Sequence, residues 1–184
     1  MNKKLKQGIR ELFKSLPFIE KSLHFVVMIG VLLQLISSSL MHVHGDTPLN
    51  KIAELAFIHI YLGIVLLPLG IIFAIKVIMR RRLFDLYPWL FGRYEGIKED
   101  AESLLKGSLP EPKPAGLAAS VEGLGLLALL LALVTGAMWF LVVNISGPNE
   151  LLLSVHKLAV TFIQIYFFAH GAFALLHLFK WWRE

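Results

Sequence analysis

The chain has 184 residues, of which 57% are hydrophobic and 17% charged, and its mean hydropathy of +0.69 is beyond what a soluble domain of this size can bury. Its net charge of +5 at pH 7 comes from cations beside apolar segments, which favours anionic lipid headgroups and excludes nucleic acid as the expected partner. The absence of cysteine excludes disulfides, Cys-ligated iron–sulfur clusters and covalently attached c-type haem.

The first predicted element is a basic amphipathic helix over residues 1–16. Apolar residues recur there at helical spacing, with lysines between them: Leu5, Ile9, Leu12, Phe13 and Leu16. A helix with one apolar and one basic face lies in the plane of the membrane surface. We therefore expect this segment at the cytoplasmic interface.

Next come apolar segments long enough to cross about 30 Å of hydrocarbon. The expected spans cover residues 18–43, 52–79, 117–143 and 151–179. Backbone polar groups must be paired inside a bilayer, so each span is expected to be a helix. The sequence thus predicts an all-α membrane protein whose residues 17–184 form a four-transmembrane-helix bundle. The third and fourth spans are joined by a very short connection and must be antiparallel neighbours.

The cytoplasmic connection 80–116 is the largest polar feature of the chain. Aromatic residues over 83–94 are typical of a segment at headgroup level. Residues 97–106 predict a short charged helix, and the prolines at 110, 112 and 114 predict a stiff extended lead into the third span. Two interpretations stay open for the region, an interfacial loop and a docking surface for a partner protein.

Charge asymmetry predicts the topology. Except for Lys51 and Lys157, the Lys and Arg residues lie in the N-terminal segment up to Lys21, in residues 76–113, or at the C-terminus. By the positive-inside rule, both termini and the long connection are cytoplasmic.

Histidines inside the spans are the most informative residues: His24, His59, His156 and His170. Ionisable residues within membrane spans are rare and usually functional. His156 and His170 share one helix face and are separated by about 21 Å along its axis. Counted from the span ends, His59 and His156 lie in the outer half, whereas His24 and His170 lie in the inner half. Depth therefore pairs His59 with His156 and His24 with His170.

Two imidazoles at one depth favour haem over other uses of histidine. A zinc site needs about four ligands clustered together, and a proton relay needs more carboxylates than Glu54 and Glu122, which lie near span ends. Two neutral imidazoles fit the axial positions of a six-coordinate haem iron, whose chemistry is electron transfer. For any single histidine, a hydrogen bond between helices is the alternative.

Further residues are candidates for contacts with the cofactor. Gly63, one turn after the second-span histidine, lets a flat ring approach the backbone, although ordinary helix packing also explains a glycine. Propionate partners are sought among the cations at the span ends, because cations pair with carboxylates: Arg80, Arg81, Arg82 and Lys157. The alternative for these cations is that they only fix the topology.

Three more histidines lie near span ends. His42 and His44 flank the outer end of the first span, as interfacial residues or as contacts to outer propionates or to a docking partner. His177 follows His170 by two turns on the same face. It is a candidate for a propionate contact or for proton uptake at a quinone, and interfacial packing is its alternative.

The motifs that carry a family resemblance are KSLHF at 21–25, FIHIYLG at 57–63, the spacing of His156 and His170, and HGAFALLH at 170–177. With these, in this order over all the spans, the chain resembles the bacterial cytochrome b561 family and the related cytochrome b subunits of Ni/Fe-hydrogenases and respiratory formate dehydrogenases. The long connection 80–116 departs from the shortest members.

The resemblance implies a di-haem b-type cytochrome of the bacterial inner membrane. It implies two noncovalent haem b groups, one held by His24 and His170 (inner) and one by His59 and His156 (outer). It also implies electron exchange with the quinone pool, with a quinone site beside His170. The partner would be a dehydrogenase or a periplasmic cytochrome, and the chain a respiratory-chain component of an oxidoreductase.

Two functions of other classes stay open from the sequence. One is a histidine-using metal or proton transporter without haem. The other is a cofactor-free anchor that recruits a complex through residues 83–116. The sequence also leaves the oligomeric state open, a homo-oligomer included.

Overall fold

The computed structural model describes residues 7–8, 16–41, 43–44 and 46–183. This part of the chain contains four long helices: α2 (Phe18–Ser39), α3 (Glu54–Arg81), α6 (Leu117–Ser146) and α7 (Glu150–Arg183). Each is long and apolar enough to cross a membrane, and no strand occurs among the described residues. The prediction of an all-helical protein with four spans is therefore confirmed. The amphipathic helix over 1–16 falls almost wholly outside the described residues and stays a prediction.

Short helices complete the order of elements: η1 (Leu49–Lys51) before α3, and then α4 (Leu83–Leu86), η2 (Pro88–Phe91) and α5 (Glu95–Leu105) between α3 and α6. The charged helix expected over 97–106 is confirmed as α5 and begins two residues earlier. At this boundary the sequence pattern and the structure agree closely.

The span boundaries differ from expectation for a physical reason. At the end of α2, the serine hydroxyls at 37–39 donate to carbonyls three residues earlier. Hydroxyls that compete in this way for helix carbonyls favour a helix end, and α2 stops at Ser39, four residues before the predicted limit. The other three helices continue beyond their apolar cores, because hydrophobicity marks only the part that fits the hydrocarbon.

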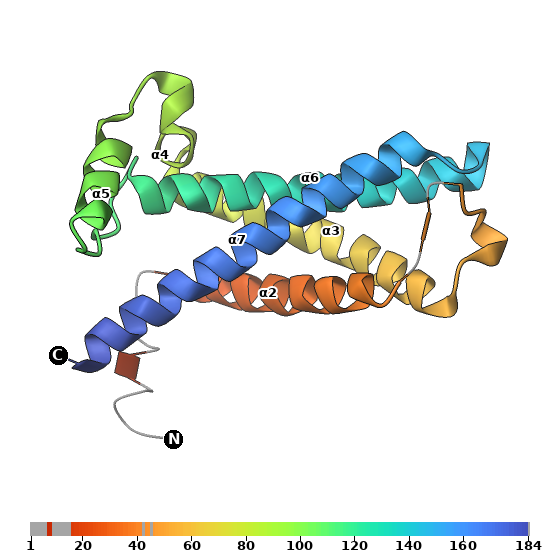
Figure 1. Ribbon diagram of the computed structural model, residues 1–184, viewed down its shortest axis with the longest axis horizontal. Coiled ribbons are helices and arrows are strands. Elements are labelled where there is room, and N and C mark those ends of the chain that lie inside the picture. The colour runs from red at the N-terminus through yellow and green to blue at the C-terminus, as the bar shows by residue number, and fades with distance from the viewer. Residues whose placement is uncertain (1–6, 9–15, 42, 45, 184) are drawn as a thin grey trace.

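Helix α6 packs along α7 and along α3. Helix α3 also packs against α2. Figure 1 shows α7 crossing the other helices obliquely. Its 34 residues make a helix of about 51 Å, which fits a hydrocarbon core of about 30 Å only at a tilt or with an end outside it. The central core takes side chains from all four helices: Val27, Val31, Leu66, Ala128, Leu129, Leu133 and Ile163.

The turn between α6 and α7 is tight. Gly147 ends α6 with φ of 86°, a backbone conformation that glycine adopts without steric penalty. The next helix begins at Glu150. The prediction that the third and fourth spans are antiparallel neighbours is confirmed.

The connection between α3 and α6 folds back onto the bundle. Leu86 is fully buried, and the Tyr87 hydroxyl donates to the Gly123 carbonyl at 2.9 Å. Burial raises the pKa of this phenol. From α5, a carboxylate oxygen of Asp100 accepts the Leu117 N–H at 2.8 Å and thereby caps the start of α6. The position of this region at headgroup level stays a prediction.

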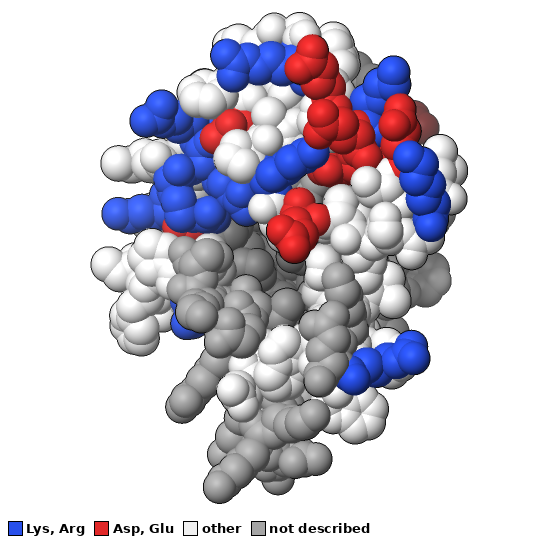
Figure 2. All heavy atoms as spheres, turned by 90° about the vertical axis from the view of Figure 1, so that its left-hand side faces the viewer, with Lys and Arg blue, Asp and Glu red and all other residues white. Residues whose placement is uncertain are grey.

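Charged residues gather at one end of the bundle. Both α4 and α5 lie at the end where α2 begins and α7 finishes (Figure 1). Seen from that side, Lys and Arg side chains cover one part of the surface, and Asp and Glu side chains group beside them (Figure 2). Lys113 forms ion pairs within the connection between α3 and α6, with Nζ 2.6 Å from a Glu99 carboxylate oxygen and 3.1 Å from an Asp100 carboxylate oxygen. Hydrogen bonds to Glu99 and then Asp100 raise the pKa of Lys113.

Candidate cofactor-binding sites

In the described part of the chain, two cavities inside the bundle each have two of the predicted histidines in their wall. The turn-end site, near the α6–α7 turn, is lined by His59 and His156. The terminus-end site, near the start of α2 and the end of α7, is lined by His24 and His170. The pairs that share a predicted depth are thus the pairs that lie together.

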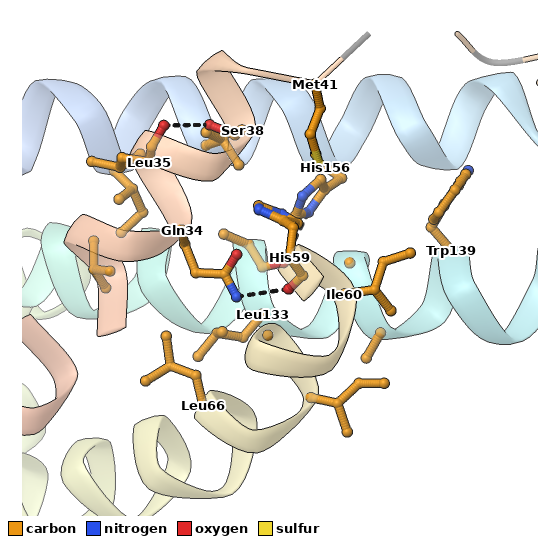
Figure 3. A pocket seen from close by; sticks show the side chains of 18 of the residues that line it. Gln34, Leu35, Ser38, Met41, His59, Ile60, Leu66, Leu133, Trp139 and His156 are labelled. Carbon is orange, nitrogen blue, oxygen red and sulfur yellow. Dashed lines mark hydrogen bonds between the residues drawn. The ribbon is translucent and has the colours of Figure 1, made fainter. Parts of the chain in front are cut away.

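In the turn-end site, α3 supplies His59 and α7 supplies His156. Their ring centroids are 6.5 Å apart and the ring planes are inclined by 79°. Figure 3 shows the two rings lying close together, with Gln34 on one side of them and Trp139 on the other. Both histidines are partly buried.

A serine of α2 contacts the ring of His59. Ser37 Oγ donates its proton to the Gln34 carbonyl at 3.1 Å, so its lone pairs face His59 Nδ1, 2.8 Å away. In this arrangement His59 Nδ1 is the donor, and Nε2 keeps a free lone pair. The amide of Gln34 also donates from Nε2 to the His59 carbonyl at 3.0 Å and holds α2 against α3.

Contacts with α6 fix His156 in the same way. Its Nδ1 lies 3.0 Å from the Ala132 carbonyl oxygen, which can only accept, so Nδ1 carries the proton. Thr135 Oγ1, which donates to the Leu131 carbonyl at 2.6 Å, lies 3.3 Å from the same Nδ1. Both histidines therefore keep Nε2 for a ligand, and a bond from Nδ1 to a protein acceptor is typical of histidines that bind metals.

The turn-end site also holds glycines and polar atoms that lack partners. A Cβ at Gly136 would lie 2.9 Å from the His156 ring, and one at Gly63 would lie 3.1 Å from the Gln34 amide nitrogen. Both glycines line the cavity. Gln34 Oε1 and Trp139 Nε1 are buried and have no hydrogen-bond partner in the described part of the chain. Unpaired buried polar atoms are rare in proteins and call for an explanation.

In the terminus-end site, α2 supplies His24 and α7 supplies His170. Their ring centroids are 6.2 Å apart, with the planes inclined by 36°. Phe73 meets His24 edge-on at 5.8 Å, and Tyr166 stacks on His170 at 5.2 Å. Tyr166 in turn packs against Gly125 of α6. His170 is exposed, unlike the other three span histidines, and it lines the cavity.

An ion-pair cluster borders the terminus-end site. Arg80 Nε donates to both carboxylate oxygens of the buried Glu20, at 2.7 and 2.9 Å. Arg80 also reaches Glu122 at 3.4 Å, and Arg81 reaches the same carboxylate at 3.1 Å. Glu122 is one of the residues that line the cavity. Two of the cations predicted to bind propionates thus pair with the protein's own acids.

The remaining residues that were predicted to contact the cofactor lie in different parts of the structure. The Arg82 guanidinium lies over the Phe84 ring at 5.8 Å, and Lys157 Nζ donates to the Val43 carbonyl at 3.0 Å. The His44 N–H is bound by the Thr47 hydroxyl at 3.1 Å. His177 lies on α7, partly buried, and His42 falls outside the described residues. Their roles stay predictions.

The spacing of the paired rings suits a cofactor held between them. Two imidazoles bound on opposite sides of one metal ion, at metal–nitrogen distances of about 2 Å, have ring centroids about 6 Å apart. The separations of 6.2 and 6.5 Å agree with that value. Among the described residues, no group of three or more His, Cys, Asp and Glu can hold a metal ion. The donor set fits haem at both sites.

Comparison with known families gives the decisive observation: the family described as prokaryotic cytochrome b561 matches residues 15–183. The chain belongs to this family. It is accordingly a multi-pass membrane b-type cytochrome of electron transfer, and haem b binding follows from family membership. Nothing supports the alternative of a haem-free transporter. No curated protein and no solved structure matches the chain.

The sequence did not predict the residues that support the histidines, namely Ser37, Ala132 and Thr135. Hydroxyl residues in an apolar span are the available signal, since a buried hydroxyl needs a partner. The pattern alone does not tell whether that partner is the helix backbone or a histidine of another span.

Proposed function

We propose that this cytochrome holds two haem b groups and carries electrons across the membrane between the quinone pool and a partner redox protein. His59 and His156 would hold one haem, and His24 and His170 the other. The proposal rests on one observation, the two histidine pairs at two depths of the bundle, each with ring centroids 6 to 7 Å apart. A bacterial inner-membrane location with cytoplasmic termini is part of the proposal.

A haem b with two imidazole ligands supplies one-electron chemistry and offers no open position to oxygen or substrate. The residues of this chain supply the rest. Ser37 and Ala132 hold the turn-end imidazoles in the ligand tautomer through Nδ1, and such bonds raise the basicity of the ligand. Apolar side chains around both sites keep water out and lower the local dielectric.

The route across the bundle follows α7. His156 and His170 lie on this helix about 21 Å apart along its axis. Between the two cavities, Val31, Leu129 and Ile163 line both, so only packed side chains separate the sites. An electron that enters at one end therefore has a second site within the same bundle to which it can pass.

The terminus-end site is the proposed place for quinone exchange. His170 is exposed on α7, and a lipid-soluble quinone approaches from the bilayer. His177 lies two turns further along the same helix and is the proposed residue for proton uptake. The redox partner, a dehydrogenase or a periplasmic cytochrome, would dock at either end of the bundle.

The deciding experiment is the dithionite-reduced minus oxidised visible spectrum of the purified protein, with quantitation as pyridine haemochrome. We expect two b haems per chain, with sharp low-spin α bands. One haem per chain would mean that one of the histidine pairs has another role. Protein made with ample haem supply that carries none would overturn the proposal.

A further inference from the structure

At the terminus-end site, one imidazole is held by an aromatic stack. Tyr166 precedes His170 by four residues on α7, so the two side chains lie on the same face of the helix. Their ring centroids are 5.2 Å apart and their planes are inclined by only 22°, which is a favourable stacking geometry. In the described part of the chain, no hydrogen bond reaches a ring nitrogen of His170. The orientation of this imidazole therefore depends on ring packing.

Helix α6 makes room for the Tyr166 ring. A Cβ at Gly125 would overlap three carbon atoms of this ring, so an alanine there would displace the phenol. Gly125, Tyr166 and His170 all line the same cavity. The Tyr166 ring thus contacts the α6 backbone as well as the imidazole, and its own orientation is restricted by the close packing of α6 on α7.

The stack leaves the nitrogen edge of His170 open to a metal. The lone pair of an imidazole nitrogen lies in the plane of the ring, whereas Tyr166 covers a face of the ring. A stacked neighbour can therefore set the direction of the imidazole plane without blocking the ligand atom.

The angle between the imidazole planes differs between the two sites. The His24 and His170 planes are inclined by 36° at the terminus end, whereas the His59 and His156 planes are inclined by 79° at the turn end. This angle matters in a low-spin ferric haem because each imidazole π-system interacts with the iron d orbital that matches its direction. Nearly parallel planes favour one d orbital over the other, and perpendicular planes treat both alike.

We infer that Tyr166 is a positioning residue that sets the plane of the His170 imidazole and so keeps the ligand planes of the terminus-end haem nearer to parallel than those of the turn-end haem. Gly125 serves the same end by leaving room for the Tyr166 ring. This inference rests on the proposed di-haem function.

The test is the electron paramagnetic resonance spectrum of the oxidised, frozen protein with both haems bound. We expect two low-spin signals, a rhombic one from the terminus-end haem and one with a larger maximum g value from the turn-end haem. His156→Ala, expected to retain only the terminus-end haem, assigns them. Tyr166→Leu should shift and broaden the rhombic signal, because His170 is then free to rotate, and leave the turn-end signal unchanged. Tyr166→Phe keeps the stack and should keep the wild-type spectrum.

A second variant moves the Tyr166 ring without removing it. Gly125→Ala should shift the same rhombic signal, because its Cβ pushes the phenol aside. The double variant with Tyr166→Leu should shift the signal no more than Tyr166→Leu alone, since interacting residues are not additive. The matched control is Phe168→Leu, which removes an aromatic ring of α7 that is 70% exposed and should leave both signals unchanged.

Two failures are distinguishable. If wild-type protein does not carry two haems, the proposed function fails. If it does carry two, the assignment of Tyr166 is overturned by two signals with the same g values, by a rhombic signal that Tyr166→Leu leaves unchanged, or by an equal shift in Tyr166→Phe. Should Tyr166→Leu lose the terminus-end haem altogether, Gly125→Ala decides, and an unchanged rhombic signal there overturns the assignment while the di-haem function stands.

Discussion

The turn-end and terminus-end sites hold their histidines by different means. At the turn end, both imidazoles are tied through Nδ1 to acceptors on neighbouring helices, Ser37 and Ala132. At the terminus end, aromatic rings flank the pair and the ion-pair cluster of Arg80 and Glu122 stands beside it. The first arrangement holds ring orientation tightly. The second leaves His170 more exposed than the other three span histidines.

Removal of one histidine is the largest change that tests this contrast. We expect His156→Ala and His170→Ala each to lower the haem content from two per chain to one, because each side chain serves one site only. Pyridine haemochrome quantitation measures the loss, and potentiometric titration shows which haem remains. A variant that loses both haems would show that the two sites assemble together.

The ion-pair cluster gives the second-largest expected effect. Arg80→Met leaves Glu20, which is 4% exposed, as a buried carboxylate without its bidentate partner. Breaking a buried pair from one side destabilises by about 3 kcal/mol, so we expect a clear fall in the thermal unfolding temperature of the detergent-solubilised protein.

The matched control for that variant is Arg82→Met, whose guanidinium contacts the Phe84 ring and which should change stability little. Arg80→Met combined with Glu20→Gln should recover part of the loss, since the buried charge is then gone. Equal effects of Arg80→Met and Arg82→Met would contradict the role given to the cluster.

The cap on α6 is expected to matter less, and only at the terminus end. Asp100→Ala removes the acceptor of the Leu117 N–H and should destabilise the connection by about 1 kcal/mol. Limited proteolysis of the connection should become faster, with the turn-end haem unaffected. The Lys113 ion pairs add to the same region. Because they raise the pKa of Lys113, their contribution is full below its unfolded pKa and disappears only at more alkaline pH, as the pH rises through the folded pKa.

The smallest predicted effect falls on the turn-end site. Ser37→Ala removes the acceptor for His59 Nδ1, which lowers the basicity of that ligand and destabilises the ferric state. We expect the midpoint potential of the turn-end haem to rise by about 40 mV, the equivalent of one hydrogen bond of about 1 kcal/mol. Ser39→Ala, which removes a hydroxyl that donates to the Ile36 carbonyl, is the control. A shift of equal size in both haems would argue against a local effect.

The sequence predicts the part of the site that depends on helical periodicity. Helix rise alone places His156 and His170 at two depths and pairs each with the histidine of another span. The supporting contacts depend on how helices rotate against one another. The approach of Ser37 to His59 across the α2–α3 contact, and of Ala132 to His156, follows from side-chain packing that no spacing rule contains.

The charges show the same division between what spacing predicts and what it does not. The positions of Lys and Arg along the sequence predict a basic end to the bundle, and Figure 2 shows Lys and Arg side chains at that end. It does not predict that Arg80 binds Glu20, a residue sixty positions earlier in the chain, because that pair depends on how α2 lies against α3. Arg80 was a candidate for a propionate contact because the sequence does not show that the carboxylate of Glu20 lies nearer.

The wall of Val31, Leu129 and Ile163 between the two cavities has a consequence for the energetics of the membrane. These side chains offer no donor or acceptor, so neither a water file nor a proton can thread from one site to the other through them. Electrons need no such chain of polar groups. In the proposed cytochrome the bundle would therefore pass electrons between the two sites without letting protons cross the bilayer along the same route.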